Sequence, residues 1–180
     1  MLKKLSDEKL ISIDGKIKFD YEKYWDAIEK ICIDIREKFD LSKEDIGIVA
    51  MARGALPMLV SISHELGIRK VSTIQLQMSN SDKLHDYGNV RVISECINDD
   101  FDKFIIFEDI IYKGKTTDKA IDILKNKGKK VLAVYSLIID EGFENIEIRN
   151  KETNIKYVYE INPDDWVYFF WETDLRKIGE

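Results

Sequence analysis

Residues 104–117 read FIIFEDIIYKGKTT, and the order of residue types in this stretch decides the fold. The four residues 104–107 are aromatic or β-branched, which predicts a buried strand that ends at Glu108 and Asp109. Gly114 then predicts a turn, and residues 117, 120, 121 and 124 share the spacing of one helix face. Two carboxylates can accept hydrogen bonds from vicinal hydroxyls or face a hydrated Mg²⁺, while a helix start favours an anion. The stretch therefore predicts a sugar-hydroxyl site beside a phosphate site.

The order of strand, helix and strand occurs twice along the chain. Helical patterns cover residues 20–39, with Asp20 as the N-cap, the segment from Pro57 to Gly67, and the segment from Thr117 to Gly128. Apolar runs that predict strands cover residues 46–51, 70–77, 90–94, 104–107 and 130–139. This arrangement predicts an α/β fold with a mainly parallel central sheet flanked by helices.

The length of 180 residues fits one domain with a single core. We expect this core over about residues 20–138. A small hood is expected over about residues 139–180 together with the N-terminal segment, because the last forty residues are rich in aromatic side chains. The polar stretch 78–89 lacks periodicity and is long for a connection, which is typical of a functional lid or of a disordered segment.

The composition excludes several classes of protein. The chain has 8 Phe, 8 Tyr and 3 Trp, more aromatic residues than a disordered chain carries. No run approaches the roughly 18 consecutive apolar residues of a membrane helix, and the first residues lack the apolar segment of a secretory signal. With 28 basic and 34 acidic residues the net charge is −6, so we do not expect nucleic-acid binding. We expect a cytoplasmic protein that binds no membrane.

Cysteine and histidine are scarce. Cys32 and Cys96 lie far apart, and we expect both to be buried free thiols in a reducing compartment. The chain has only two histidines, so a zinc site of Cys and His ligands is not expected. Carboxylate and phosphate oxygens would hold any metal, which points to Mg²⁺ as the cofactor.

Two further motifs lie outside the acidic stretch. Arg53 and Gly54 follow the apolar run 46–51, where an arginine can offer forked donors to a pyrophosphate and a glycine lets the backbone approach it. Residues 165–172 read DWVYFFWE, an aromatic strand pattern that ends in Glu172. A surface turn and an ordinary strand with alternating buried and exposed rings would explain the same two patterns without a ligand.

Taken in this order, the three motifs resemble the signature of the type I phosphoribosyltransferases, and most closely the bacterial xanthine-guanine (purine) enzymes. The similarity spans about residues 20–175 and includes HELGIRKV at residues 64–71. It implies the fold of that family. It also implies transfer of the 5-phosphoribosyl group from phosphoribosyl pyrophosphate (PRPP) to a purine-like nucleobase, with release of pyrophosphate.

The resemblance also implies roles for individual residues. Glu108 and Asp109 would hold the ribose hydroxyls of PRPP, and these two acids and Arg53 are the expected catalytic residues. The other PRPP contacts would come from Gly54 and from a loop that holds the 5′-phosphate, made of Tyr112, Lys113, Gly114, Lys115, Thr116 and Thr117. Trp166 would stack on the base and the Val167 backbone would read its edge. Asp109 and Glu172 would bind Mg²⁺.

Two positions depart from the purine enzymes. Tyr112 stands where they usually carry an Asp that faces N7 of the purine as the proposed acid or base. A tyrosine has a reference pKa of about 10 and cannot do this near neutral pH. Leu137 stands where they carry a Lys that donates to the 6-oxo group, and it cannot donate a hydrogen bond. Tyr112 and Leu137 are still expected at the base site, but the sequence supports PRPP binding more than recognition of guanine, xanthine or hypoxanthine.

Two alternatives to a purine transferase stay open. Tyr112 and Leu137 are compatible with a PRPP- or nucleotide-binding regulator that has lost catalysis, and with a transferase for a non-standard base. The expected ligands are PRPP and a nucleobase or nucleoside monophosphate. Since family members usually pair, we expect a homodimer or homotetramer.

Overall fold

A computed structural model describes residues 2–78, 90–140, 149–150, 152–163 and 165–172. In these residues, one seven-stranded sheet has the order β1-β8-β7-β6-β3-β4-β5, and a two-stranded sheet pairs β2 with β9. The strands are β1 (Leu2–Lys4), β2 (Lys16–Phe19), β3 (Ile46–Ala52), β4 (Val71–Gln77), β5 (Arg91–Cys96), β6 (Lys103–Ile111), β7 (Lys130–Asp140), β8 (Asn154–Ile161) and β9 (Trp166–Phe169). The helices are α1 (Tyr21–Lys38), α2 (Leu56–Leu66), α3 (Lys115–Asn126) and the short 3₁₀ helix η2 (Phe170–Glu172).

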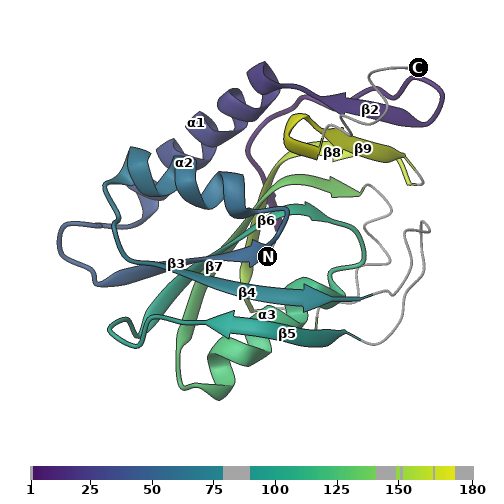
Figure 1. Cartoon of the computed structure of the whole chain (residues 1–180). Coiled ribbons are helices and arrows are strands. Elements are labelled where there is room, and N and C mark those ends of the chain that lie inside the picture. Colours follow the sequence, from purple (N-terminus) through teal and green to yellow (C-terminus); the bar gives the residue numbers. More distant parts are fainter. Residues whose placement is uncertain (1, 79–89, 141–148, 151, 164, 173–180) are drawn as a thin grey trace.

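The main sheet is parallel apart from β5, which runs antiparallel to β4. At its centre, β3 lies between β4 and β6, with Ile48 opposite Val71 on one side and Ile105 on the other. Figure 1 shows α1 and α2 on one face of this sheet and α3 on the other. The predicted α/β fold with a mainly parallel sheet is confirmed.

The central strands are apolar on both faces because helices cover both faces. Along β3, Ile48 and Ala50 belong to the core shared with α1 and α2, while Val49 and Met51 belong to the core shared with α3. Strand β6 alternates in the same way, with Phe107 on the α1 and α2 side. These two cores explain why unbroken apolar runs, rather than alternating ones, marked the central strands in the sequence.

Local signals place the helix ends. Asp20 caps α1 by accepting a hydrogen bond from the backbone N–H of Lys23 at 3.0 Å. Pro57 lies in the first turn of α2, and Gly67 ends this helix in the left-handed conformation with φ 69°. Both helix starts and the glycine stop agree with the sequence patterns.

The structure differs from the sequence-based expectations in two strands, β6 and β8. Strand β6 continues beyond the acidic pair to Ile111, because Ile110 and Ile111 stay paired with Ile138 and Ile139 of β7. Strand β8 lies in the segment expected to form the hood, yet it joins the main sheet between β7 and β1. Within the described residues, β2 and β9 form the separate small sheet.

The expectation of two buried thiols is wrong for one cysteine. Cys32 is buried in α1, whereas Cys96 is exposed at the end of β5. Strand β5 is the outer strand of the sheet and all its residues are exposed, which explains the difference. Both cysteines are free. Within the described part of the chain, each helix is too short or too polar to span a lipid bilayer, and of the expected 78–89 lid, residues 79–89 lie outside the described residues.

Candidate active site

The topology brings the carboxyl ends of β3 and β6 together. From β3, the crossover through α2 leads to β4 on one side, and from β6, the crossover through α3 leads to β7 on the other. The sheet order therefore reverses between these two neighbouring strands. In open parallel sheets, ligands bind outside the carboxyl ends of the strands at such a reversal. The arginine motif follows β3 and the acidic motif lies near the end of β6, so both reach this point.

The turn after β3 presents an arginine beside a crowded glycine. Arg53 is exposed, and the peptide bond between Ala52 and Arg53 is cis. A Cβ on Gly54 would lie 1.9 Å from Oδ2 and 2.3 Å from Cγ of Asp109. Only glycine fits against the Asp109 carboxyl group at this distance without displacement of a neighbour. The structure thus brings Arg53, Gly54 and Asp109 together, as the sequence predicted for two separate motifs.

Strand alternation sends the two acids to opposite faces of the sheet. Glu108 points toward α3, where its carboxylate accepts hydrogen bonds from the hydroxyls of Thr116, at 3.2 Å, and Thr117. Asp109 points toward Gly54, which precedes α2. The two acids therefore do not form one side-by-side pair. Asp109 faces the turn that carries Arg53, while Glu108 faces the start of α3.

Burial dominates the electrostatics of both acids. It raises the pKa of Glu108 to about 8, although the hydrogen bonds from Thr117 and Thr116 act in the opposite direction. It also raises the pKa of Asp109 to about 6, against the lowering effect of the backbone N–H groups of Ile110 and Asp109. The negative charge of Glu172 adds to the rise at Asp109. A bound cation, or a hydroxyl group that donates a hydrogen bond, would favour the charged form of each acid.

Glu172 completes the acidic side of the site from η2. Burial raises the pKa of its carboxyl group, while the Phe169 backbone N–H, at 3.5 Å, and the charge of Arg53 lower it. Glu172 thus lies within electrostatic reach of both Asp109 and Arg53. The described residues hold no group of three or more His, Cys, Asp or Glu side chains arranged around a metal. Mg²⁺ commonly uses one or two protein carboxylates and takes its other ligands from phosphates and water, so Asp109 and Glu172 fit that donor set.

The turn before α3 offers backbone donors to an anion. Gly114 is the N-cap in the left-handed conformation, with φ 71°, and no side chain caps the helix. The first hydrogen bond of the helix runs from the Asp118 backbone N–H to the Gly114 carbonyl oxygen at 2.8 Å. The N–H groups of the first turn precede that bond and have no partner within the helix. Lys113 and Lys115 flank Gly114 as half-buried cations.

Strand β9 presents alternate faces, as its sequence pattern indicates. Trp166 and Tyr168 are exposed, at 37% and 46%, whereas Val167 and Phe169 are buried against the core. β9 pairs with β2 along one edge within the described residues. The Phe169 and Trp171 rings stack at 4.6 Å and fix the entry into η2.

Tyr112 and Leu137, the other two residues predicted to contact the base, lie against or within the hydrophobic core. Tyr112 is half-buried and packs against the core that α1 and α2 share with the sheet. Leu137 has no exposed surface and belongs to the same core. It therefore offers no accessible side-chain surface to a base.

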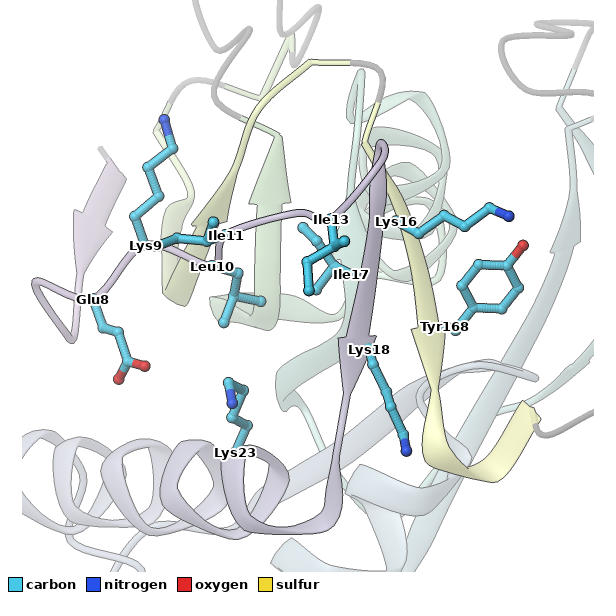
Figure 2. Close-up of a pocket in the computed structure, with 10 residues that line it drawn as sticks. All are labelled: Glu8, Lys9, Leu10, Ile11, Ile13, Lys16, Ile17, Lys18, Lys23 and Tyr168. Atoms are coloured by element: carbon cyan, nitrogen blue, oxygen red, sulfur yellow. The ribbon is translucent and has the colours of Figure 1, made fainter.

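A pocket of about 490 Å³ is lined mainly by the N-terminal arm, residues 8–18, and is completed by Lys23 and by Tyr168 of the third motif. Figure 2 shows it between the N-terminal arm, α1 and β2, with Leu10 and Ile17 among its lining residues. None of the residues predicted for PRPP or metal binding lines it. Its volume is in the range of small-molecule sites, but the chemical groups gather instead at the ends of β3 and β6.

The sequence patterns missed one polar residue near the site. Asp118 lies in the first turn of α3, is 3% exposed, and binds Arg149 and Asn150. A carboxylate on the otherwise apolar face of a predicted helix was the available signal, but its partners are about thirty residues away in the sequence.

Comparisons with known proteins identify the family of the chain. Residues 20–177 match the phosphoribosyl transferase domain family. The xanthine-guanine phosphoribosyltransferase of Vibrio parahaemolyticus is 28% identical over 152 residues, which cover 84% of this chain and 88% of that protein. The hypoxanthine phosphoribosyltransferase of Buchnera aphidicola is 27% identical over 135 residues, or 74% of this chain and 73% of the relative.

The fold agrees as well. The solved structure of the xanthine-guanine-hypoxanthine phosphoribosyltransferase of Helicobacter pylori superposes with a TM-score of 0.68 and 17% identity, covering 91% of this chain and 98% of that one. Since the family match spans well over half of the sequence, the chain belongs to the phosphoribosyltransferase family and is a PRPP-dependent glycosyltransferase.

Proposed function

We propose that the protein transfers the 5-phosphoribosyl group from PRPP to a purine-like nucleobase and releases pyrophosphate. The observation that carries this proposal is the meeting of Arg53, Asp109 and Glu172 where the sheet order reverses, beside the uncapped start of α3. The two curated relatives named above act on purine bases, which supports a purine-like acceptor.

PRPP has three groups that these residues suit. The pyrophosphate suits the forked donors of Arg53 and the turn at Gly54. The ribose hydroxyls suit the Asp109 carboxylate, which has the Gly54 backbone at close range. The 5′-phosphate suits the N–H groups that follow Gly114, together with Lys113 and Lys115. Along PRPP, the pyrophosphate, the ribose and the 5′-phosphate follow one another, and we propose that the three sets of residues bind them in that order.

We propose a role for Glu108 that differs from the ribose contact implied by the family resemblance. Its carboxylate is held by Thr116 and Thr117, which the sequence placed in the phosphate loop. We propose that Glu108 orders the start of α3 from inside the protein, and that Asp109 is the acid that first meets the ribose. Thr116 and Thr117 would then contact the phosphate mainly through their backbone N–H groups.

Mg²⁺ is the proposed cofactor. Burial and mutual repulsion of Asp109 and Glu172 disfavour two bare carboxylates, and a divalent cation would relieve both effects. When bound with PRPP, it would neutralise the charge of the departing pyrophosphate. Asp109 and Glu172 would hold it, and Arg53 would bind the pyrophosphate from the other strand.

The reaction then follows from placement. A ring nitrogen of the base attacks C1 of PRPP while the bond from C1 to pyrophosphate breaks, through a transition state with oxocarbenium character. Arg53 stabilises the negative charge that develops on the leaving group. Trp166 offers an exposed ring for stacking, and the Val167 backbone would read the edge of the base. Leu137 is buried, so we leave it out of the proposed base site.

The discriminating experiment measures pyrophosphate release from PRPP and Mg²⁺ with a panel of purine, pyrimidine and modified bases. We expect release with at least one purine-like base. Asp109→Ala should weaken PRPP binding strongly, though to an affinity that titration calorimetry still measures, whereas the exposed control Asp99→Ala should bind as the wild type does. Unchanged PRPP binding in Asp109→Ala would overturn the ribose assignment.

A regulator that binds PRPP or a nucleotide without turnover is the second candidate function. Tyr112 favours it, because a tyrosine stands where the purine enzymes carry an acid. Tight PRPP binding with no pyrophosphate release for any base would establish this alternative and exclude the transferase. Calorimetry with nucleoside monophosphates identifies the ligand in that case.

We also propose a homodimer or homotetramer in the cytoplasm. Tyr21 and Trp25 on α1 and Val60 on α2 are exposed apolar side chains, the two helices contact one another, and exposed apolar surface of this kind suits a subunit contact. The two free cysteines suit a reducing compartment. Size-exclusion chromatography with light scattering measures the number of subunits, and a monomer at all concentrations would contradict the proposal.

A further inference from the structure

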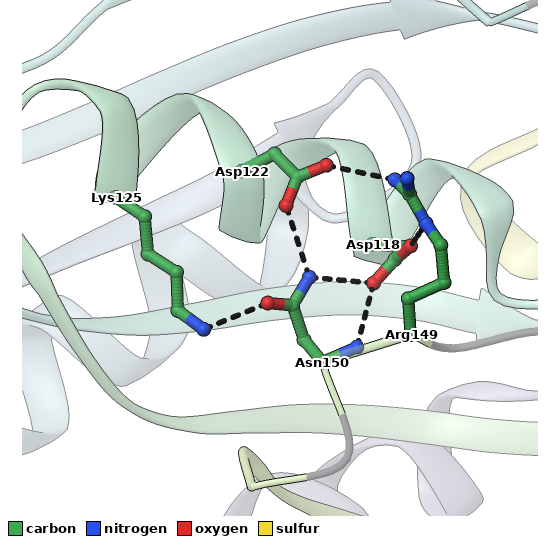
Figure 3. Close-up of polar contacts among 5 residues, drawn as sticks. All are labelled: Asp118, Asp122, Lys125, Arg149 and Asn150. Atoms are coloured by element: carbon green, nitrogen blue, oxygen red, sulfur yellow. Dashed lines mark hydrogen bonds and ion pairs between the residues drawn. The ribbon is translucent and has the colours of Figure 1, made fainter.

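A polar clamp ties the start of α3 to residues 149 and 150, as Figure 3 shows. It consists of Asp118 and Asp122 on α3, with Arg149 and Asn150 just before β8. The Arg149 side chain donates through Nε to Asp118 at 2.7 Å and through Nη2 to Asp122 at 2.8 Å. The Asn150 amide donates to Asp118 at 2.6 Å and to Asp122 at 3.1 Å. The Asn150 backbone N–H adds a third bond to Asp118 at 3.1 Å.

Asp118 differs from Asp122 in its place on the helix. The backbone N–H of Asp118 closes the first turn of α3 on the Gly114 carbonyl oxygen at 2.8 Å. The same residue therefore closes the proposed phosphate turn through its backbone and anchors it through its side chain. From the other side, Glu108 holds Thr116 and Thr117 of the same turn. Asp122 lies one turn further along α3 and makes no contact with Gly114 in the described structure.

The charge of Asp118 also needs its partner. Burial alone would raise the pKa of this carboxyl group, but the hydrogen bonds from Arg149 and Asn150 outweigh burial and hold the pKa below its ordinary value. Asp118 is therefore an anion close to the helix start that is proposed to receive a phosphate. Arg149 neutralises it, so that the clamp removes a repulsion as well as holding the turn.

We propose that Asp118 is a positioning residue for the 5′-phosphate of PRPP, and that it acts through the first turn of α3. This inference rests on the proposed function, because it assigns the Gly114 turn to that phosphate. Asp118 does not touch the substrate. Its side chain sets where the N–H donors of the turn lie, and hydrogen bonds from these donors weaken as their distances and angles depart from the favoured geometry.

Two fragments of the substrate separate this role from a structural one. Ribose 5-phosphate contains the ribose and the 5′-phosphate but lacks the pyrophosphate. Pyrophosphate with Mg²⁺ is instead expected to bind at Arg53 and at the proposed metal ligands Asp109 and Glu172. In titration calorimetry, Asp118→Asn should bind ribose 5-phosphate roughly tenfold more weakly and bind pyrophosphate as the wild type does. Asp122→Asn loses contacts to the same Arg149 and Asn150, so it is the matched control and should leave both affinities near the wild-type values.

A second variant keeps the test decisive if Asp118→Asn folds poorly. Arg149→Gln keeps Asp118 but leaves its charge without the guanidinium, and it should also weaken ribose 5-phosphate while pyrophosphate binding stays intact. Equal losses for both fragments, or equal effects of Asp118→Asn and Asp122→Asn, would overturn the positioning role. If the wild type binds neither fragment nor PRPP, the proposed function fails, and this inference fails with it.

Discussion

At the scale of single residues, the contact between Gly54 and Asp109 joins the two motifs that carry the proposed chemistry. The sequence separates them by more than fifty residues, yet a Cβ at position 54 would overlap the Asp109 carboxyl group. A glycine in this turn is therefore explained by the approach of the Asp109 side chain from the neighbouring strand. The Asp109 carboxyl group can lie where it does because residue 54 has no Cβ atom.

Gly54→Ala tests this contact. The added methyl group must push the Asp109 side chain away, since the nearest atom would lie at 1.9 Å. We expect PRPP binding to weaken by at least tenfold, or about 1.4 kcal/mol, while circular dichroism keeps its wild-type form. Titration calorimetry measures the affinity.

The control for this prediction uses Asp109→Ala as the background. With the carboxyl group gone, the methyl group at position 54 has space, so Gly54→Ala should cause little further loss. Losses that add fully in the double variant would show that Gly54 acts on something other than Asp109.

At the scale of elements, a buried charge network joins α1, β7 and β8. Asp34 of α1 accepts hydrogen bonds from Tyr135 of β7 at 2.6 Å and from Lys156 of β8. All three side chains are buried, and Lys156 also lies 3.1 Å from the Tyr135 hydroxyl. A buried charge without its partner is strongly unfavourable, so the network specifies how α1 lies on these two strands.

The network makes stability depend on pH in a definite direction. Burial alone would raise the pKa of Asp34, but the hydrogen bonds from Lys156 and Tyr135 outweigh it and the pKa falls below the ordinary value of 3.8. A group whose pKa is lowered in the folded state stabilises the fold above its unfolded pKa. That contribution is lost as the pH falls below about 4.

Lys156→Met should therefore destabilise the protein by about 3–5 kcal/mol near neutral pH, because it leaves Asp34 buried without its main partner. It should also remove the Asp34 part of the acid loss of stability, because burial then raises the pKa of Asp34 in the folded state and protonation at low pH favours the fold, so the destabilisation becomes smaller as the pH falls. Urea unfolding between pH 3 and pH 8 measures both effects. Lys3→Met is the control: Lys3 is half-exposed and 3.5 Å from Asp34, so its loss should change stability by less than about 1 kcal/mol. A Lys156→Met profile parallel to that of the wild type would contradict the assignment.

At the scale of the whole molecule, the sequence predicted those elements whose signals lie within a short stretch of residues. β3 and β6 are apolar on both faces, and α2 carries a proline at its start and a glycine at its end, so their order was readable. The position of β8 was not, because its aromatic residues suggested a hood and only pairing with β7 and β1 places it in the main sheet. The residue pattern of a strand does not indicate which other strand it pairs with.

The candidate site follows the same division. Arg53, Asp109 and Gly114 were found from motifs, because their spacing within one strand or turn is local. The burial of Leu137 and the clamp at Asp118 depend on contacts between distant segments. Strand alternation alone could have separated Glu108 from Asp109, since consecutive residues of a strand face opposite sides.

The charge of the whole molecule gives the last prediction. A chain of net charge −6 binds an anionic substrate only where local cations and a metal reverse that charge. PRPP with Mg²⁺ should therefore stabilise the protein by about 2.7 kcal/mol at a hundredfold excess over its Kd, and thermal unfolding measures this. Mg²⁺ alone should have little effect, because Asp109 and Glu172 supply only part of its ligand set. In the presence of EDTA, most of the stabilisation by PRPP should disappear. Equal stabilisation with and without EDTA would show that the two carboxylates hold no metal when PRPP binds.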